Sequence, residues 1–135
     1  GKNIVGELLD FKGILGTSVL KFFDVTIGQT GMNNSSVDEV NADVRVIRYT
    51  ANNHASYYPN VQPMHLCMFV HARTQQLLGL QIVGGDGVDK RIDVFATAMT
   101  ANMSLKDLSD LDLSYAPPYN GVWDPLQQMA NRFSS

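Results

Sequence analysis

Alternating hydrophobic and polar positions predict several β-strands in the first two-thirds of the chain. Residues 44–50, 65–72 and 77–83 alternate with period two, and residues 18–25 are rich in β-branched and aromatic side chains. A further extended segment covers residues 26–30. Period-two alternation is typical of strands that bury one face. Because four residues separate the segments 65–72 and 77–83, we expect these two to form an antiparallel hairpin.

Helical spacing follows the strands. The apolar residues of this segment, Ile92, Phe95, Ala96, Met99 and Met103, fall at i, i+3, i+4, i+7 and i+11. Such a stripe predicts an amphipathic helix of about three turns. A shorter apolar pattern at residues 4–11 predicts another helix at the start of the chain, which ends before the glycines at 13 and 16.

Local signals predict three more helices. Ser36 is followed by Glu39, and Ser104 by Asp107, which are two capping boxes that start short helices. The first of these is expected to end near residue 42. Pro125 stands at the first position of a final helix over residues 126–132. Strands followed by helices indicate the α+β class, an antiparallel β-sheet with helices packed on one face.

Composition excludes several classes of protein. The 135 residues are 44% hydrophobic and 17% charged with a net charge of −3, so we expect one folded domain rather than a disordered chain. Lys and Arg are scattered singly, which argues against a nucleic-acid partner, and no apolar run is long enough for a membrane span. The chain lacks a G-x-G-x-x-G fingerprint. A single cysteine suits a reducing compartment, so a cytoplasmic location is expected.

The histidines and the cysteine give little support to a metal or nucleophilic site. His65 and His71 share a strand face but stand roughly 20 Å apart, and His54 lies in a separate loop. We therefore expect no metal. Cys67 lies in an alternating strand with no basic neighbour in sequence, so we interpret it as a core residue.

Tyrosines gather in two proline-containing loops. Tyr57 and Tyr58 precede Pro59, and Tyr115 and Tyr119 flank a pair of prolines. Proline restricts the conformations of these loops, and a fixed phenol can donate a hydrogen bond to a developing anion or thiolate. The alternative is that the tyrosines only pack at the core edge or in an interface.

Several motifs occur in the order found in one enzyme family. They are 16–19 (GTSV), 21–24 (KFFD), 30–31 (TG), 54–59 (HASYYP), 78–84 (LGLQIVG), 90–93 (KRID), 115–119 (YAPPY) and 124–125 (DP). Together they resemble the C-terminal dimerisation domain of the FAD-dependent pyridine nucleotide-disulfide oxidoreductases, over essentially the whole chain. The two tyrosine motifs are most similar to the branch of coenzyme A-disulfide reductases and NADH-dependent persulfide and polysulfide reductases.

This resemblance implies a division of the chain and a set of partners. Residues 1–16 would be the tail of a preceding FAD-binding domain, and residues 17–135 the dimerisation domain. FAD and NAD(P)H would belong to the full-length enzyme, a homodimer that reduces coenzyme A disulfide or persulfide, and no cofactor is expected in this fragment. Cys67 does not match the family's redox-active cysteine, so the fragment alone is expected to be inactive.

The resemblance also assigns roles to tyrosines. Tyr57 and Tyr115 would bring their hydroxyls near the reactive sulfur of the partner subunit, where they could stabilise or protonate a thiolate leaving group. Tyr58 is a substitute for Tyr57, because the sequence does not say which of them points inward. Tyr115 falls where glutathione reductase-like members carry a catalytic histidine. The alternatives are an NADH oxidase or peroxidase, a purely structural dimerisation module, or a free-standing ligand-binding domain.

Overall fold

A five-stranded antiparallel sheet forms the base of the structure. The computed structural model describes residues 13–37 and 43–133. The strands are β1 (Ser18–Phe22), β2 (Val25–Gly31), β3 (Val44–Asn52), β4 (Pro63–His71) and β5 (Leu77–Gly84). They are ordered β1-β2-β5-β4-β3, with every neighbouring pair antiparallel. The predicted β4–β5 hairpin is confirmed.

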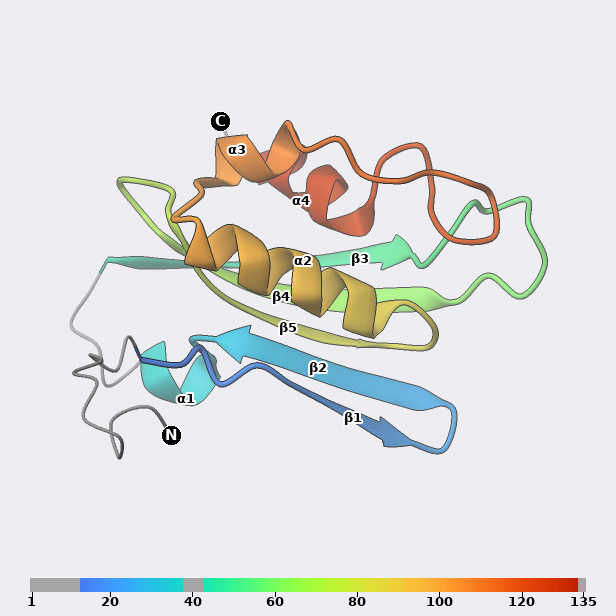
Figure 1. The fold of residues 1–135 in the computed structure, drawn as a ribbon, viewed down its shortest axis with the longest axis horizontal. Coiled ribbons are helices and arrows are strands. Elements are labelled where there is room, and N and C mark those ends of the chain that lie inside the picture. The colour runs from blue at the N-terminus through green and yellow to red at the C-terminus, as the bar shows by residue number, and fades with distance from the viewer. Residues whose placement is uncertain (1–12, 38–42, 134–135) are drawn as a thin grey trace, which may run out of the picture.

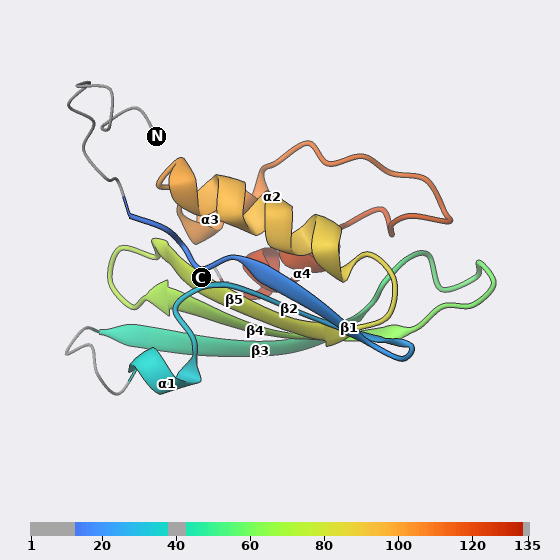
Figure 2. The ribbon, with the colours of Figure 1, turned by 60° about the horizontal axis from the view of Figure 1, so that its bottom comes forward.

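Three of the helices cover one face of this sheet. The helices are α1 (Asn34–Val37), α2 (Val88–Thr100), α3 (Leu105–Ser109) and α4 (Pro125–Phe133). Figure 1 shows α2, α3 and α4 gathered over the strands, and Figure 2 shows the short α1 on the opposite side of the sheet. The predicted α+β class is confirmed. We call the side away from α2, α3 and α4 the open face.

The core lies between the sheet and the three helices. It is made by alternate residues of the central strands and by one side of each helix: Ile47, Met64, Leu66, Met68, Val70, Leu80, Ile82, Val88, Ile92, Phe95, Leu105, Leu108, Leu126 and Met129. Helix α2 approaches β2 closely at Gly28, where a Cβ would lie 2.5 Å from Ile92 Cγ1. A side chain at this position would therefore push the helix off the sheet.

Two predictions near the start of the chain are wrong in detail. Residues 18–25 are not one strand, because a turn at Phe23 and Asp24 separates β1 from β2. Phe23 adopts a φ of 51°, an uncommon left-handed conformation for a side chain without a local polar group. The helix after β2 is not capped by Ser36. Instead Asn33 Oδ1 accepts hydrogen bonds from the N–H groups of Ser35 (3.0 Å) and Ser36 (3.1 Å), so the helix begins at Asn34.

Other predictions lie partly or wholly outside the described residues. The predicted helix at 4–11 and the end of the helix expected near residue 42 belong to this group. The later predictions are confirmed: Ser104 and Asp107 form the capping box of α3, and Pro125 is the first residue of α4. Helix α2 runs from Val88 to Thr100, so Met103 lies beyond it.

Candidate functional site

Two loops that lie far apart in sequence meet at one end of the sheet. The first loop covers residues 53–62 between β3 and β4, and the second covers residues 110–124 between α3 and α4; both extend to the right in Figure 1. The Ala55 N–H donates to the carbonyl of Pro117 across the two loops at 3.3 Å. Across the two loops, the hydroxyl oxygens of Tyr57 and Tyr115 are 3.2 Å apart. We call these two residues the tyrosine pair.

The first loop is closed at its base by one asparagine. The Asn53 N–H donates to the Gln62 carbonyl at 3.0 Å, and Asn53 Oδ1 accepts from the Gln62 N–H at 2.9 Å. Within the loop, the Tyr58 N–H donates to the Ala55 carbonyl at 2.9 Å. Side-chain bonds of Asn to nearby backbone groups stabilise tight turns, so the loop that carries Tyr57 is held at both ends.

A second asparagine shapes the other loop in the same way. The N–H groups of Tyr119 (2.9 Å) and Asn120 (3.0 Å) both donate to the Ala116 carbonyl. The Asn120 side chain is 1% exposed, and its Nδ2 donates to the Ser114 carbonyl at 3.3 Å. This bond spans the residues that carry Tyr115.

A buried arginine lies between the two loop bases. Arg91 of α2 is 1% exposed, and its Nε donates to Asp124 Oδ2 at 3.0 Å. Its Nη2 lies 3.0 Å from the carbonyl oxygen of Asn53 and 3.0 Å from Asn120 Oδ1. It also donates to the carbonyl oxygens of Gly87 (Nη1, 3.1 Å) and Tyr119 (Nη2, 3.4 Å). The guanidinium therefore connects α2, both loops and the residue before α4.

Sequence reasoning missed this arginine. It appeared only within the motif 90–93 (KRID), but Arg91 shares the buried side of α2 with Val88, Ile92 and Phe95. The spacing of these four residues was the available signal, because it places Arg91 within the apolar stripe of the helix. A charged residue is rarely buried unless it is paired, so this position indicates a buried partner.

The tyrosine pair is accessible from outside. Tyr57 is 74% and Tyr115 48% exposed. The hydrogen bond with Tyr115 raises the pKa of the Tyr57 phenol above its ordinary value, and burial and the charge of an ionised Tyr115 raise it further. Because an ordinary phenol titrates near pH ~10, Tyr57 stays protonated at neutral pH and remains a hydrogen-bond donor.

Tyr58 points to a different place. Its ring lies edge-on to His54, with 5.7 Å between ring centroids, and it lines a pocket of about 370 Å³ together with Lys90 and Tyr119. The tyrosine pair instead lines a pocket of about 270 Å³ with Val122. The structure thus brings Tyr57 and Tyr115 together and leaves Tyr58 outside the pair.

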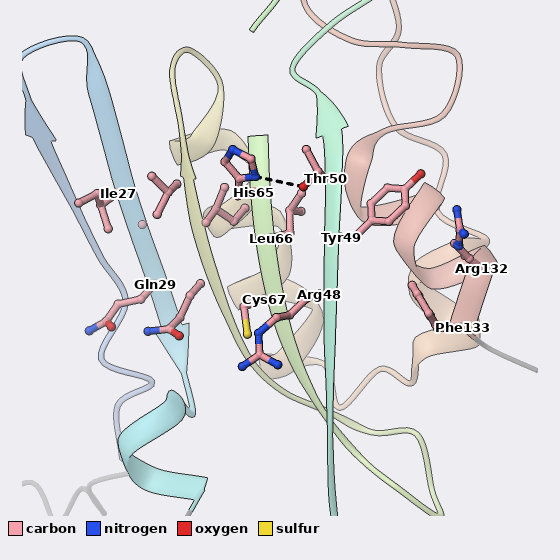
Figure 3. Close-up of a pocket in the computed structure, with 14 residues that line it drawn as sticks. Ile27, Gln29, Arg48, Tyr49, Thr50, His65, Leu66, Cys67, Arg132 and Phe133 are labelled. Atoms are coloured by element: carbon pink, nitrogen blue, oxygen red, sulfur yellow. Dashed lines mark hydrogen bonds between the residues drawn. The ribbon is translucent and has the colours of Figure 1, made fainter. Parts of the chain in front are cut away.

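Another pocket lies on the open face, away from the tyrosine pair. It has a volume of about 680 Å³ and extends across β2, β5, β4 and β3 (Figure 3). His65 Nδ1 and Thr50 Oγ1 are 3.0 Å apart within it. Cys67 also lies here, half-buried on the face that α2, α3 and α4 leave uncovered, so its interpretation as a core residue is wrong.

The open-face pocket offers weak chemistry. Burial raises the pKa of the Cys67 thiol, and the positive charge of Arg48 opposes this shift by a smaller amount. A thiol with a raised pKa is a poor nucleophile. Among the described residues, no group of three His, Cys, Asp or Glu side chains could hold a metal ion.

The described residues do not fit a dinucleotide such as FAD or NAD(P)H. Dinucleotide-binding units need parallel strands joined by a helix, whereas the strand pairs of this sheet are antiparallel. The glycine-containing turn before α2 is filled by protein, because a Cβ at Gly87 would lie 2.2 Å from Arg91 Nη1. No helix within residues 13–37 and 43–133 is long and apolar enough to cross a membrane.

Known proteins similar to this chain share its sequence and its fold. The chain is 42% identical over 130 residues to an NAD(P)H sulfur oxidoreductase (CoA-dependent) of Pyrococcus furiosus, covering 96% of this chain and 29% of the relative. It is 36% identical over 114 residues to a coenzyme A disulfide reductase of Staphylococcus aureus, covering 84% and 26%. Less than a third of each of these relatives is therefore represented here.

A solved structure is similar to this chain in both sequence and fold. The reduced CoADR-RHD of Bacillus anthracis superposes with a TM-score of 0.88 at 44% identity, over 92% of this chain and 22% of that one. Residues 17–126 also match a defined protein family, and this match covers both loops of the tyrosine pair. The chain belongs to the pyridine nucleotide-disulphide oxidoreductase dimerisation domain family.

Proposed function

We propose that this chain is the dimerisation domain of an NAD(P)H- and FAD-dependent enzyme that reduces coenzyme A disulfide or coenzyme A persulfides and polysulfides. The names of the relatives, among them an NAD(P)H coenzyme A polysulfide/persulfide reductase of Pyrococcus horikoshii, support this substrate class. The observation that carries the proposal is the tyrosine pair, two exposed phenols with their oxygens 3.2 Å apart on two anchored loops. In the homodimer, this pair completes the disulfide site of the partner subunit.

The chemical role of the pair is to assist the leaving sulfur. When a thiolate attacks one sulfur of a disulfide, the S–S bond breaks and the other sulfur takes the bonding electron pair as a thiolate. A protonated phenol that donates a hydrogen bond to this sulfur stabilises the developing charge. The raised pKa of Tyr57 suits a donor rather than a base.

The remaining parts of the enzyme lie outside residues 17–135 of this chain. FAD and NAD(P)H supply the electrons when they are bound to those parts, which also carry the reactive cysteine. We assign residues 1–16 to the end of the FAD-binding domain and residues 17–135 to the dimerisation domain. The one cysteine of this chain fits a cytoplasmic enzyme, because a reducing compartment keeps thiols free.

The test is the exchange of both phenols for phenyl rings in the full-length enzyme. Removing one preorganised donor from an anion site costs about 10² to 10³ in kcat. Since the two phenols here can replace one another in part, we expect about a tenfold loss for Tyr57→Phe alone and about 100-fold for Tyr57→Phe with Tyr115→Phe. The measurement is the steady-state reduction of coenzyme A disulfide, with the rate of flavin reduction by NADH followed separately by stopped-flow absorbance.

Two further variants make the result specific. Tyr119→Phe, in the same loop as Tyr115 and 72% exposed, should leave kcat unchanged. Tyr58→Phe distinguishes the neighbouring phenols, because a loss for this variant in place of Tyr57→Phe would assign the role to Tyr58. Wild-type kcat in the double variant would leave the domain with a purely structural role.

A further inference from the structure

One guanidinium group holds both loops of the tyrosine pair at their bases. Nη2 of Arg91 donates to the carbonyl oxygen of Asn53, where the first loop begins, and to Oδ1 of Asn120, at the end of the segment that carries Tyr115. Its Nε is paired with Asp124, and both side chains of this ion pair are 1% exposed. A charged group buried at this depth needs an ion-pair partner and hydrogen bonds that offset the loss of water.

We infer that Arg91 is a positioning residue, which sets the separation of the Tyr57 and Tyr115 hydroxyls and thereby the rate of disulfide cleavage. The effect of Arg91 on the rate rests on the proposed function, whereas the positioning of the two phenols by Arg91 does not depend on that function. Arg91 touches neither phenol, so it acts through the two loop bases.

The shape of the arginine side chain explains why one residue can serve both loops. A guanidinium presents five N–H donors in a rigid plane, and here they reach oxygens of the turn before α2 and of both loops. Lysine has the same charge but no fixed fork, so it cannot hold these oxygens in one geometry.

The direct backbone hydrogen bond between the two loops is weaker. The Ala55 N–H donates to the Pro117 carbonyl at 3.3 Å, which is longer than the usual range for an N–H to oxygen bond. In contrast, the two bonds from Arg91 Nη2 to the loop bases are both 3.0 Å. Arg91 belongs to α2, whose Ile92 and Phe95 are fully buried against the sheet, so the shared anchor is fixed to the core.

The experiment uses the full-length homodimeric enzyme with Arg91→Lys, which keeps the charge opposite Asp124. A misplacement of 1 Å in an active site costs about 10² in rate, and a partly retained anchor should cost about tenfold in kcat with KM unchanged. The second readout is the titration of the Tyr57 phenol, followed by the NMR shift of its ζ carbon. In Arg91→Lys we expect its pKa to fall towards the ordinary phenol value, because the bond to Tyr115 loosens. Arg73→Met is the matched control, since Arg73 pairs with Asp43 at the surface with 80% of its side chain exposed; it should change neither readout.

A double-mutant comparison separates this inference from the proposed function. If Arg91 acts through the tyrosine pair, Arg91→Lys should cause no further loss of kcat in an enzyme that already carries Tyr57→Phe and Tyr115→Phe. If that tyrosine variant keeps the wild-type kcat, the proposed function fails, whereas the Tyr57 titration still decides whether Arg91 positions the pair.

Two results would overturn the inference. The first is a folded, flavin-loaded Arg91→Lys enzyme with wild-type kcat and an unchanged Tyr57 titration. The second comes from amide hydrogen exchange in the wild-type enzyme, so it applies even if the Arg91→Lys variant does not fold. A common anchor predicts that the N–H groups of Tyr58 and Asn120, one in each loop, exchange with solvent through the same opening free energy. Independent opening of the two loops would contradict a shared anchor.

Discussion

The buried ion pair of Arg91 and Asp124 gives a sharp prediction about stability. Asp124→Asn keeps the size of the side chain but removes its charge, which leaves the guanidinium unpaired in a site where both side chains are 1% exposed. Removing one partner of a buried ion pair typically destabilises a protein by about 3–5 kcal/mol. Because a domain of this size is stable by only about 5–15 kcal/mol, the variant loses a large part of its stability.

The assay is urea unfolding of the 135-residue chain, followed by circular dichroism. With a slope of about 1.5 kcal/mol per molar urea, a loss of 3 kcal/mol moves the midpoint by about 2 M. The matched control is Asp110→Asn, which removes the same charge from the exposed pair of Lys106 and Asp110. Surface pairs contribute little, so this control should unfold at the wild-type midpoint.

A second variant tests the reason for the loss. Replacing an isolated buried ion pair by apolar residues often restores stability. Here the change of Arg91→Met with Asp124→Leu should stay destabilised, because Arg91 also donates to four other oxygens that would lose their partner. Full recovery in this variant, or a wild-type midpoint for Asp124→Asn, would refute the view of Arg91 as a hub of hydrogen bonds.

Three further predictions concern other parts of the fold. Gly79→Ala should destabilise the chain by about 3 kcal/mol or more in the same assay, because a Cβ at Gly79 would lie 2.1 Å from the backbone oxygen of Met32. An unchanged urea midpoint would mean that the backbone at Met32 can move. Alkylation of Cys67 by iodoacetamide should be slower than that of glutathione at neutral pH and should rise at a higher pH, since burial raises the pKa of the thiol; a rate equal to that of glutathione would count against this. Hydrogen bonds from the backbone N–H and the hydroxyl of Ser104 lower the pKa of Asp107. The stability that this cap contributes is therefore present above the ordinary carboxyl pKa, and it is lost as the pH falls through the lowered pKa. Ser104→Ala should therefore be most destabilising near neutral pH, and a difference in urea midpoint that stays constant into acid would contradict this.

Local patterns predicted most of the fold. Strands with period-two alternation, such as β4 and β5, and helices with side-chain caps, such as α3, were found from the sequence because their signals are close together in the chain. The turn at Phe23 and Asp24 was missed because aspartate is its only turn-favouring residue and stands within a run of aromatic and β-branched side chains. Asn33 was missed as a helix cap because Ser36 three residues before Glu39 offered a competing signal.

Sequence patterns also identified only part of the candidate site. The tyrosines were identified because they stand in proline-containing loops with recognisable motifs. Arg91 was not, because its partners Asn53, Asn120 and Asp124 lie 29 or more residues away in sequence. Cys67 was assigned to the core because alternation predicts two strand faces but does not say which of them the helices cover.

In the two loops, the groups that anchor the backbone are separate from the phenols, and this has a consequence for how such a domain can change. The bonds that shape the loops come from backbone groups and from Asn53, Asn120 and Arg91, whereas the phenols of Tyr57 and Tyr115 bond each other. Substitutions of these two tyrosines can therefore introduce other chemistry, such as an imidazole, while the loops that carry them keep their shape. Evolution or protein engineering could exchange the reactive groups of this domain one at a time without having to redesign the scaffold that presents them.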